Sequence, residues 1–232
     1  MTIFFKAVRM DGTDFYSGSV DYAAALASGE PLPELSGDVE FPGRGWYHLA
    51  TVPTECVGMT WPCRLFEVEP VGDVCMDNAH PHKIGARSVR VLREIDAHRV
   101  FGPQSEQVAA LIERRRTLSA AEADRLAAVW NAAWNVAWSA ALAAALAATR
   151  DAARDAAWAP AVGAAWDATR DAARYPARDA AAALLCRDLI GQAPAWDQAS
   201  YDLLTGPWRD VIGPIHPDDG DEGLGLNLDG EK

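Results

Sequence analysis

The chain has 232 residues, 21 basic and 33 acidic, for a formal net charge of −12. A wide basic surface for a nucleic-acid backbone is therefore absent, and we expect no direct binding of DNA or RNA. The length suffices for one large domain or two modest ones with a core that needs no disulfide bonds.

The cysteines and the first residues indicate a reducing compartment. Cys56, Cys63, Cys75 and Cys186 are irregularly spaced and do not resemble a disulfide framework. The opening "MTIFFKAVRMDG" reaches a charge at Lys6 without a long apolar stretch, so we predict no secretory signal and a cytoplasmic location.

Residues 1–102 mix short β-branched and aromatic runs with glycine and proline, which predicts a small α+β domain. A helix is expected over 20–28, preceded by Ser19 and closed by Gly29. Alternation in "CRLFEVE" places Phe66 and Val68 on one face, as in a half-buried strand. The expected strands are 4–9, 45–50, 63–69 and 88–95.

Residues 103–215 predict an alanine- and tryptophan-rich helical hairpin or bundle, so the fold class is α+β overall. One helix is expected over 104–116 with Ser105 as a possible cap, and a capping box of Ser119 and Glu122 starts another. That second helix continues without interruption to Ala159-Pro160.

A further helix is expected over 162–190, with a kink or break at Tyr175 before Pro176 and a C-cap at Gly191. A short amphipathic helix follows, ends at Gly206-Pro207, and leads to a final turn around Trp208. The remaining segment, 216–232, is acidic and glycine-rich and is expected to be a disordered tail.

Trp130, Trp134 and Trp138 lie four residues apart in "WNAAWNVAW" and are the candidate interaction residues. No basic residue lies between 127 and 149, which argues against a stacking platform for single-stranded nucleic acid. This uncharged stretch is long enough to span a bilayer, but its alanines and asparagines and its single cluster of tryptophans argue against a membrane helix. The remaining interpretations are packing within a helical hairpin and a surface for a homodimer or a protein partner.

Chemical motifs are scarce. The sequence holds no P-loop, G-x-G-x-x-G, G-x-S-x-G or H-E-x-x-H motif. Cys75, His80 and His82 lie close together, with Cys56 and Cys63 upstream, but their spacing lacks the tight pairs of a zinc site. We therefore expect no metal and no cofactor.

Four phrases follow one another in the first part: "FKAVRMDGTDFYSG", "GWYHLATVP", "RLFEVEPVGDV" and "HKIGARSVRVLREI". Together they resemble an uncharacterised domain of phage and actinobacterial genomes. The helical part, which ends in "YDLLTGPWRDVIGPIHPDD", is similar to C-terminal regions of actinobacterial and actinophage proteins. The resemblance implies a phage or host accessory protein acting in the host cytoplasm.

The phrase "GWYHLA" is also similar to the strand that enters the cleft of ADP-ribosyltransferase-like folds. That resemblance implies Arg9, His48 and Glu69 or Glu94 as catalytic candidates. This sequence lacks the Ser-Thr-Ser element of those enzymes.

The combined prediction is a non-enzymatic protein-binding accessory protein that acts on a host protein, in host takeover or anti-defence. It would bind its partner, or a second copy, through the helical region. Two alternatives remain open: an ADP-ribosyltransferase-like or nucleotide-binding enzyme in the first domain, and an acidic mimic of DNA.

Overall fold

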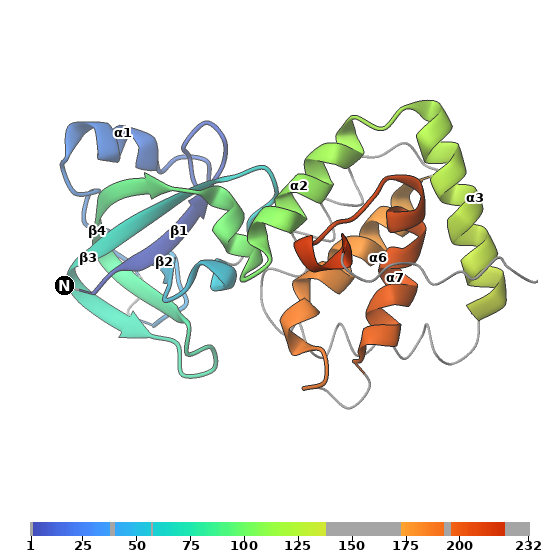
Figure 1. Cartoon of the computed structure of the whole chain (residues 1–232). Helices are drawn as coiled ribbons and strands as arrows, with labels where there is room; N and C mark the ends of the chain where they lie inside the picture. Colours follow the sequence, from blue (N-terminus) through green and yellow to red (C-terminus); the bar gives the residue numbers. More distant parts are fainter. Residues whose placement is uncertain (1, 38–39, 57, 138–172, 193–195, 221–232) are drawn as a thin grey trace, which may run out of the picture.

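The computed structural model describes residues 2–37, 40–56, 58–137, 173–192 and 196–220. A small antiparallel barrel with one helix beside it is followed by a group of packed helices (Figure 1). The protein therefore has the predicted α+β fold.

Four strands close the barrel in the order β1-β2-β4-β3. Two of them are short, β1 (Phe4–Val8) and β2 (Tyr47–Ala50). The other two are long and form one hairpin, β3 (Arg64–Met76) and β4 (Lys83–Ile95). Each predicted strand is present, but β3 and β4 are much longer than the sequence pattern indicates.

Two β-bulges bend the β3–β4 hairpin. At the first, Glu67 and Val68 face Arg93 and Val91, so that β4 has one extra residue. At the second, β3 has the extra residue, and Gly72 adopts a left-handed φ of 81° that disfavours other side chains. Bulges increase bending and twist, which allows two long strands to curl until the short strands can close the wall.

Alternate side chains of β1 belong to two different hydrophobic clusters. Phe4 and Val8 face the barrel interior, whereas Phe5 and Ala7 face the helices. Tyr22, the first residue of α1 (Tyr22–Ser28), packs into the barrel interior and is 1% exposed. The other buried members of the barrel interior are Ala25, Leu32, Tyr47, Leu49, Phe66, Val68, Ile84, Ala86, Val89 and Val91.

The ends of α1 follow from its sequence. Gly29 closes the helix at φ 73°, as expected. The N-cap is Asp21, whose Oδ1 accepts a hydrogen bond from the Ala24 N–H at 2.8 Å. The helix thus begins two residues later than the sequence pattern suggests.

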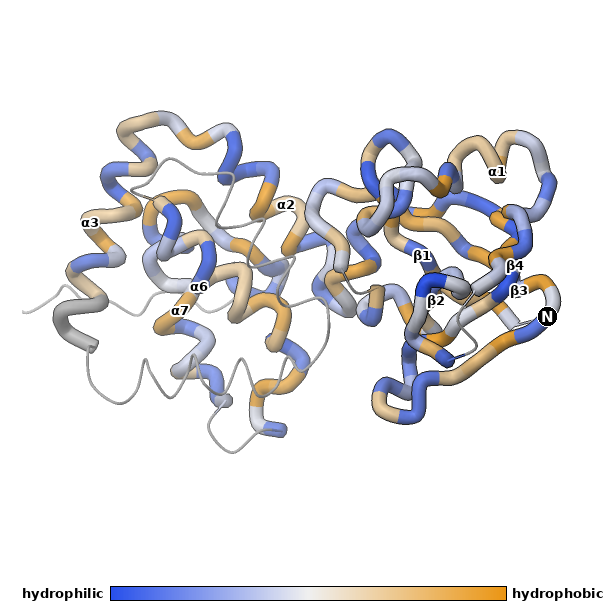
Figure 2. Tube along the Cα trace, turned by 180° about the vertical axis from the view of Figure 1, so that it is seen from behind, coloured by the Kyte–Doolittle hydropathy of each residue, from blue (hydrophilic) through white to orange (hydrophobic). Residues whose placement is uncertain are grey.

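The helical part begins after Gly102, where the two compositions of the sequence meet. Its helices are α2 (Ser105–Arg116), α3 (Ala120–Ala137), α6 (Arg174–Leu185) and α7 (Gln198–Val211). Short 3₁₀ turns join or flank them: η1 (Pro53–Glu55), η2 (Ala97–Phe101), η4 (Arg187–Leu189) and η5 (Pro217–Gly220). Hydrophilic and hydrophobic residues alternate in short stretches along α2 and α3 (Figure 2), as expected for helices with one buried face.

One core joins the barrel wall to the helices. Ala7 and Leu65 of the barrel, Phe101 of η2 and Trp208 of α7 belong to the same cluster of buried residues. Trp61 packs on Phe101 with ring centroids 4.7 Å apart. Side chains from both parts of the sequence are therefore needed to complete this core.

The capping box before α3 forms as expected. Glu122 Oε2 accepts a hydrogen bond from the Ser119 N–H at 2.8 Å, and Ser119 Oγ accepts one from the Glu122 N–H at 3.2 Å. Ser105 does not cap α2, because it is the first helical residue and its Oγ lies 3.1 Å from His98 Nδ1. Residues 138–159 of the long helix expected here lie outside the described part of the chain.

One of the two expectations about proline is wrong. Pro176 lies in the first turn of α6, which begins at Arg174 next to the break expected at Tyr175, and its missing N–H leaves no helical hydrogen bond unmade. Residues 162–172 of the helix expected before it lie outside the described part. Helix α7 continues through Gly206-Pro207 to Val211. Continuation costs about 3 kcal/mol of helix propensity, which burial of Leu204 and Trp208 on the same helix offsets.

The segment expected as a tail from His216 begins with an ordered turn. Asp219 Oδ2 accepts hydrogen bonds from the Ile215 and His216 N–H groups, and the Tyr201 hydroxyl donates to its Oδ1 at 3.2 Å. These bonds hold η5 against α7. Residues 221–232 lie outside the described part.

Trp208→Ala tests whether burial of Trp208 supports the path of α7. We expect a loss of about 3–5 kcal/mol in the free energy of unfolding, since the indole is 1% exposed and leaves a cavity. Urea unfolding followed by circular dichroism measures it. The control Tyr16→Ala, at a side chain 87% exposed, should change stability by at most about 0.5 kcal/mol. Equal stabilities of the two variants would contradict the assigned role of Trp208.

Candidate functional site

The predicted catalytic residues do not converge. In the β1–β3 ladder Val8 lies opposite Arg64 and Phe4 opposite Val68. Glu69 is therefore level with Ile3 at one end of β1, whereas Arg9 follows the other end. Six residues of extended chain separate these levels by about 20 Å, so Arg9 and Glu69 cannot act on one substrate atom.

Arg9 and Glu94 are engaged in local structure. Arg9 Nη2 donates to the Phe15 carbonyl at 2.9 Å, and the guanidinium packs so tightly under Gly18 that a Cβ there would lie 2.8 Å from Nη1. Glu94 accepts two hydrogen bonds from Arg64, at 2.8 and 2.7 Å. Such a bidentate pair orients both side chains across the sheet.

His48 lies on the outer face of β2 beneath the loop that precedes the strand. Its Nε2 is 3.3 Å from the Gly43 carbonyl, and its ring meets Phe41 edge-on at 5.0 Å. Burial lowers the pKa of His48; the Gly43 carbonyl opposes this effect, while Lys6 and Lys83 add to it. A neutral imidazole held by a loop carbonyl is suited to fixing that loop.

Phe41 belongs to a group of aromatic side chains on the same face of β2. It covers Gly85, where a Cβ would lie only 2.6 Å from the Phe41 ring, and it meets Trp46 edge-on. Arg87 lies 3.7 Å from the centre of the Trp46 ring and donates to the Gly45 carbonyl at 2.6 Å. These contacts explain the "GWYHLA" phrase by packing: its aromatic residues attach a loop to β2 and β4.

The wall between β1 and β2 is paired at only one position, Phe5 with Ala50. Continuing this register would place Ala7 opposite His48. At that level side chains, instead of backbone hydrogen bonds, connect the two strands. Lys6 Nζ donates to the His48 carbonyl at 3.1 Å, and Cys56 interacts with the Ala7 N–H. We call this stretch, between Lys6–Val8 and Trp46–His48, the β1–β2 seam.

The amine of Lys6 is enclosed although the residue as a whole is partly exposed. It lies 5.6 Å from the centre of the Tyr22 ring. Burial lowers the pKa of Lys6, and the nearby Cys56 and Asp14 oppose this shift. Burial also raises the pKa of Cys56, to about 11. The seam is thus closed by one poorly solvated cation and one un-ionised thiol.

The predicted interaction residues are only partly described. Trp130 donates from its indole N–H to Asp179 Oδ2 at 3.0 Å and stacks on Tyr175 at 5.1 Å. Asp179 is 1% exposed; burial raises its pKa, and Arg178 and Trp130 oppose this. Trp130 therefore joins α3 to α6 within the chain. The side chain of Trp134, and Trp138 altogether, lie outside the described part.

Histidines at the β3–β4 turn are held by neighbours within the turn or beside it. His80 Nδ1 lies 3.0 Å from Asp77 Oδ2, and His82 Nδ1 lies 2.8 Å from Thr51 Oγ1. Within the described ranges no three histidine, cysteine or acidic side chains are grouped as metal ligands, and the four cysteines form no disulfide.

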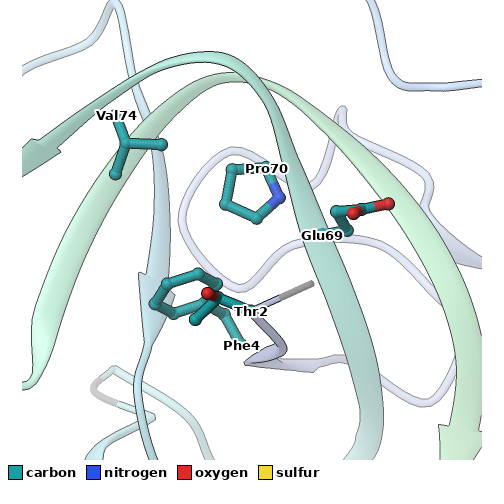
Figure 3. Close-up of a pocket in the computed structure, with 5 residues that line it drawn as sticks. All are labelled: Thr2, Phe4, Glu69, Pro70 and Val74. Atoms are coloured by element: carbon teal, nitrogen blue, oxygen red, sulfur yellow. The ribbon is translucent and has the colours of Figure 1, made fainter.

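A hollow lies at the end of the barrel where β1 starts, beneath the bend of β3 (Figure 3). It has a volume of about 270 Å³ and is lined by Thr2, Phe4, Glu69, Pro70 and Val74. We call it the tip hollow. Phe4 forms its floor and packs on the barrel core behind it. Glu69, a catalytic candidate from the sequence, lies here beside apolar groups instead of a second acid or base.

The segments that line the tip hollow carry exposed apolar residues, of which Val74 is itself part of the lining. The exposed fractions are 40% for Ile3, 48% for Val74 and 61% for Met76. Exposed apolar side chains gathered at one place mark binding surfaces more often than scattered ones do. The sequence contained one signal for this surface, the alternation of Val74 and Met76 after a Gly-Asp pair, but nothing in it showed that the strand continues past Pro70.

Comparisons with protein-family models, with curated proteins and with solved structures gave no match. No helix among the described residues is both long enough and apolar enough to cross a membrane. The fold and the tip hollow therefore characterise this protein directly: an antiparallel barrel on a helical base, with an open apolar surface at its far end.

Lys6→Met tests the closure of the β1–β2 seam. Methionine fills similar space without a buried charge, but it leaves the His48 carbonyl without its donor, so the test uses how the stability difference between the two proteins changes with pH. The folded-state pKa of Lys6 is lowered, so the unfolded chain binds more protons between that value and 10.5. The stability of wild type therefore rises with pH in this window, and the stability of Lys6→Met falls relative to it.

Urea unfolding of both proteins at several pH values from neutral to about 10 measures this difference. A stability difference that stays constant across the range would show that the Lys6 amine is solvated, contrary to the structure.

Proposed function

We propose that this protein binds a partner protein at the tip hollow and works as a binding protein without chemistry of its own. The observation that carries the proposal is the open apolar hollow with exposed Val74 in its lining, on segments that also carry exposed Ile3 and Met76. In the setting that the sequence resemblance implies, it would be an accessory protein of phage or actinobacterial origin acting on a host protein in the cytoplasm.

The size and lining of the tip hollow favour a protein side chain as its occupant. Sites for drug-sized ligands and cofactors have volumes of roughly 300–1,000 Å³ and several convergent polar groups. The tip hollow, at about 270 Å³, is lined by apolar Phe4, Pro70 and Val74 together with Thr2 and Glu69, and the Glu69 carboxylate is directed away from Phe4 (Figure 3). One apolar side chain of a partner would fill much of it, and the exposed rim would extend the contact.

The location differs from the one the tryptophans suggest. Trp130 is engaged with Asp179 and Tyr175 of its own chain. Val74 and Met76 contribute to no buried cluster among the described residues. The barrel tip is therefore the better-supported surface for a partner.

Val74→Glu tests this proposal. A carboxylate on the wall of the tip hollow should weaken partner binding by about tenfold or more, since it must be desolvated on docking. Wild type, Val74→Glu and the control Tyr16→Glu serve as immobilised baits in a host extract. Proteins retained by wild type and Tyr16→Glu but not by Val74→Glu are then purified, and their affinities are measured by calorimetry.

Retention of the same partners, with equal affinity, by Val74→Glu and wild type would overturn the tip hollow as the binding site. Circular dichroism of each bait confirms that the substitution leaves the fold intact.

A further inference from the structure

We infer that the partner of the tip hollow binds as an extended segment, added as a strand to the free edge of β3, with a basic side chain placed beside Glu69. The inference rests on the proposed function and specifies how the tip hollow is filled. Three observations carry it: an unpaired strand edge, a hollow in line with that edge, and acidic groups without a counter-charge.

The edge exists because β1 is too short to cover β3. The β1–β3 ladder ends at Phe4 opposite Val68, whereas β3 continues to Met76 paired only with β4. Ile3 and Thr2 continue the chain beside Glu69 and Pro70 without pairing. From Val71 to Met76, no backbone hydrogen bond among the described residues reaches the other edge of β3. Residues 65–68 of β3 are buried, but every residue from Glu69 to Met76 is at least partly exposed. Unpaired N–H and C=O groups of this kind are the template for strand addition.

The hollow lies where an added strand would place a side chain. Pro70 and Val74 turn toward Phe4, while Glu69 points away on the other side of β3 (Figure 3). Side chains of an added strand alternate between the same two sides. A segment running along β3 would therefore place one apolar residue over Phe4 and its neighbour on the Glu69 side.

The acidic residues of β3 favour a basic side chain at the position on the added strand next to the apolar one. Glu69 lies opposite Arg90 in the β3–β4 register, but the Arg90 guanidinium donates to the Gly29 carbonyl. Glu69 has no ion pair within the described part of the chain, nor has Asp73 on the bulge. Two acidic groups beside an apolar hollow complement lysine or arginine, and cross-strand pairs of opposite charge are favourable.

The same charges disfavour a second copy as the occupant. Two β3 edges paired antiparallel around Val71 would bring Glu69 of each copy beside Asp73 of the other, and like charges directly opposite destabilise a sheet. The geometry thus fits a foreign basic segment better than this chain itself.

Synthetic peptides test the inference on the full chain. The first alternates valine and lysine over about nine residues, the length of a long strand. The second has glutamate for each lysine. The third keeps the side chains of the first but is N-methylated at every residue, so that neither of its edges can pair with β3. Binding is measured by calorimetry, and its location by the amide shifts of residues 69–76 in NMR spectra.

We expect the lysine peptide to bind with shifts confined to the β3 edge and its surroundings. The glutamate peptide should bind about tenfold more weakly or not at all, and so should the N-methylated peptide, which cannot pair with the edge. Glu69→Gln should reduce the affinity for the lysine peptide several-fold. The matched control Glu106→Gln, on an exposed residue of α2, should not change it.

Equal binding of the lysine peptide with and without N-methylation would overturn strand addition, and equal binding of the lysine and glutamate peptides would overturn the role of charge. If wild type forms a dimer in sedimentation experiments, Val74→Arg dissociates that dimer, and no peptide binds, then the occupant of the edge is a second copy. If a partner is lost with Val74→Glu but no peptide binds, this inference fails while the proposed function stands. If partners bind Val74→Glu as tightly as wild type, both this inference and the proposed function fail.

Discussion

The unequal lengths of the strands determine where the wall of the barrel is paired and where it is open. Two 13-residue strands, β3 and β4, are closed by strands of only five and four residues. A short strand cannot satisfy the whole edge of a long one, so the wall must be completed by other groups or left open. Both outcomes occur here. Side chains complete the wall at the β1–β2 seam, and the edge of β3 from Glu69 onward is left open beside the tip hollow.

The β1–β2 seam and the tip of the barrel therefore differ in the groups that lie there. At the seam, ionisable groups are buried to satisfy backbone atoms: the Lys6 amine serves the His48 carbonyl. These groups have shifted pKa values because burial penalises their charged forms, which is a consequence of closure and does not require a substrate. At the tip, Glu69 lies beside exposed apolar residues, a combination that suits recognition of an extended segment.

The helical part supports this arrangement from the opposite side. Its core includes Ala7 and Leu65 of the barrel wall, so the outer face of β1 and β3 is covered by helices, not by solvent. Trp208 reaches this core only because α7 runs through Gly206-Pro207. The open edge of β3 lies away from these helices (Figure 1), which leaves it accessible to a partner.

The sequence by itself determined the elements whose signals are local: the α+β class, the inner faces of the strands, Gly29 at the end of α1, and the Ser119–Glu122 capping box. Only the tertiary structure decided the rest. Pro70, Gly72 and Asp73 oppose strand formation locally, yet pairing with β4 carries β3 through them; likewise burial of Trp208 carries α7 through a proline. The strand register also separated Arg9 from Glu69. Such relations depend on contacts between residues far apart in the chain, which local propensity and spacing do not encode.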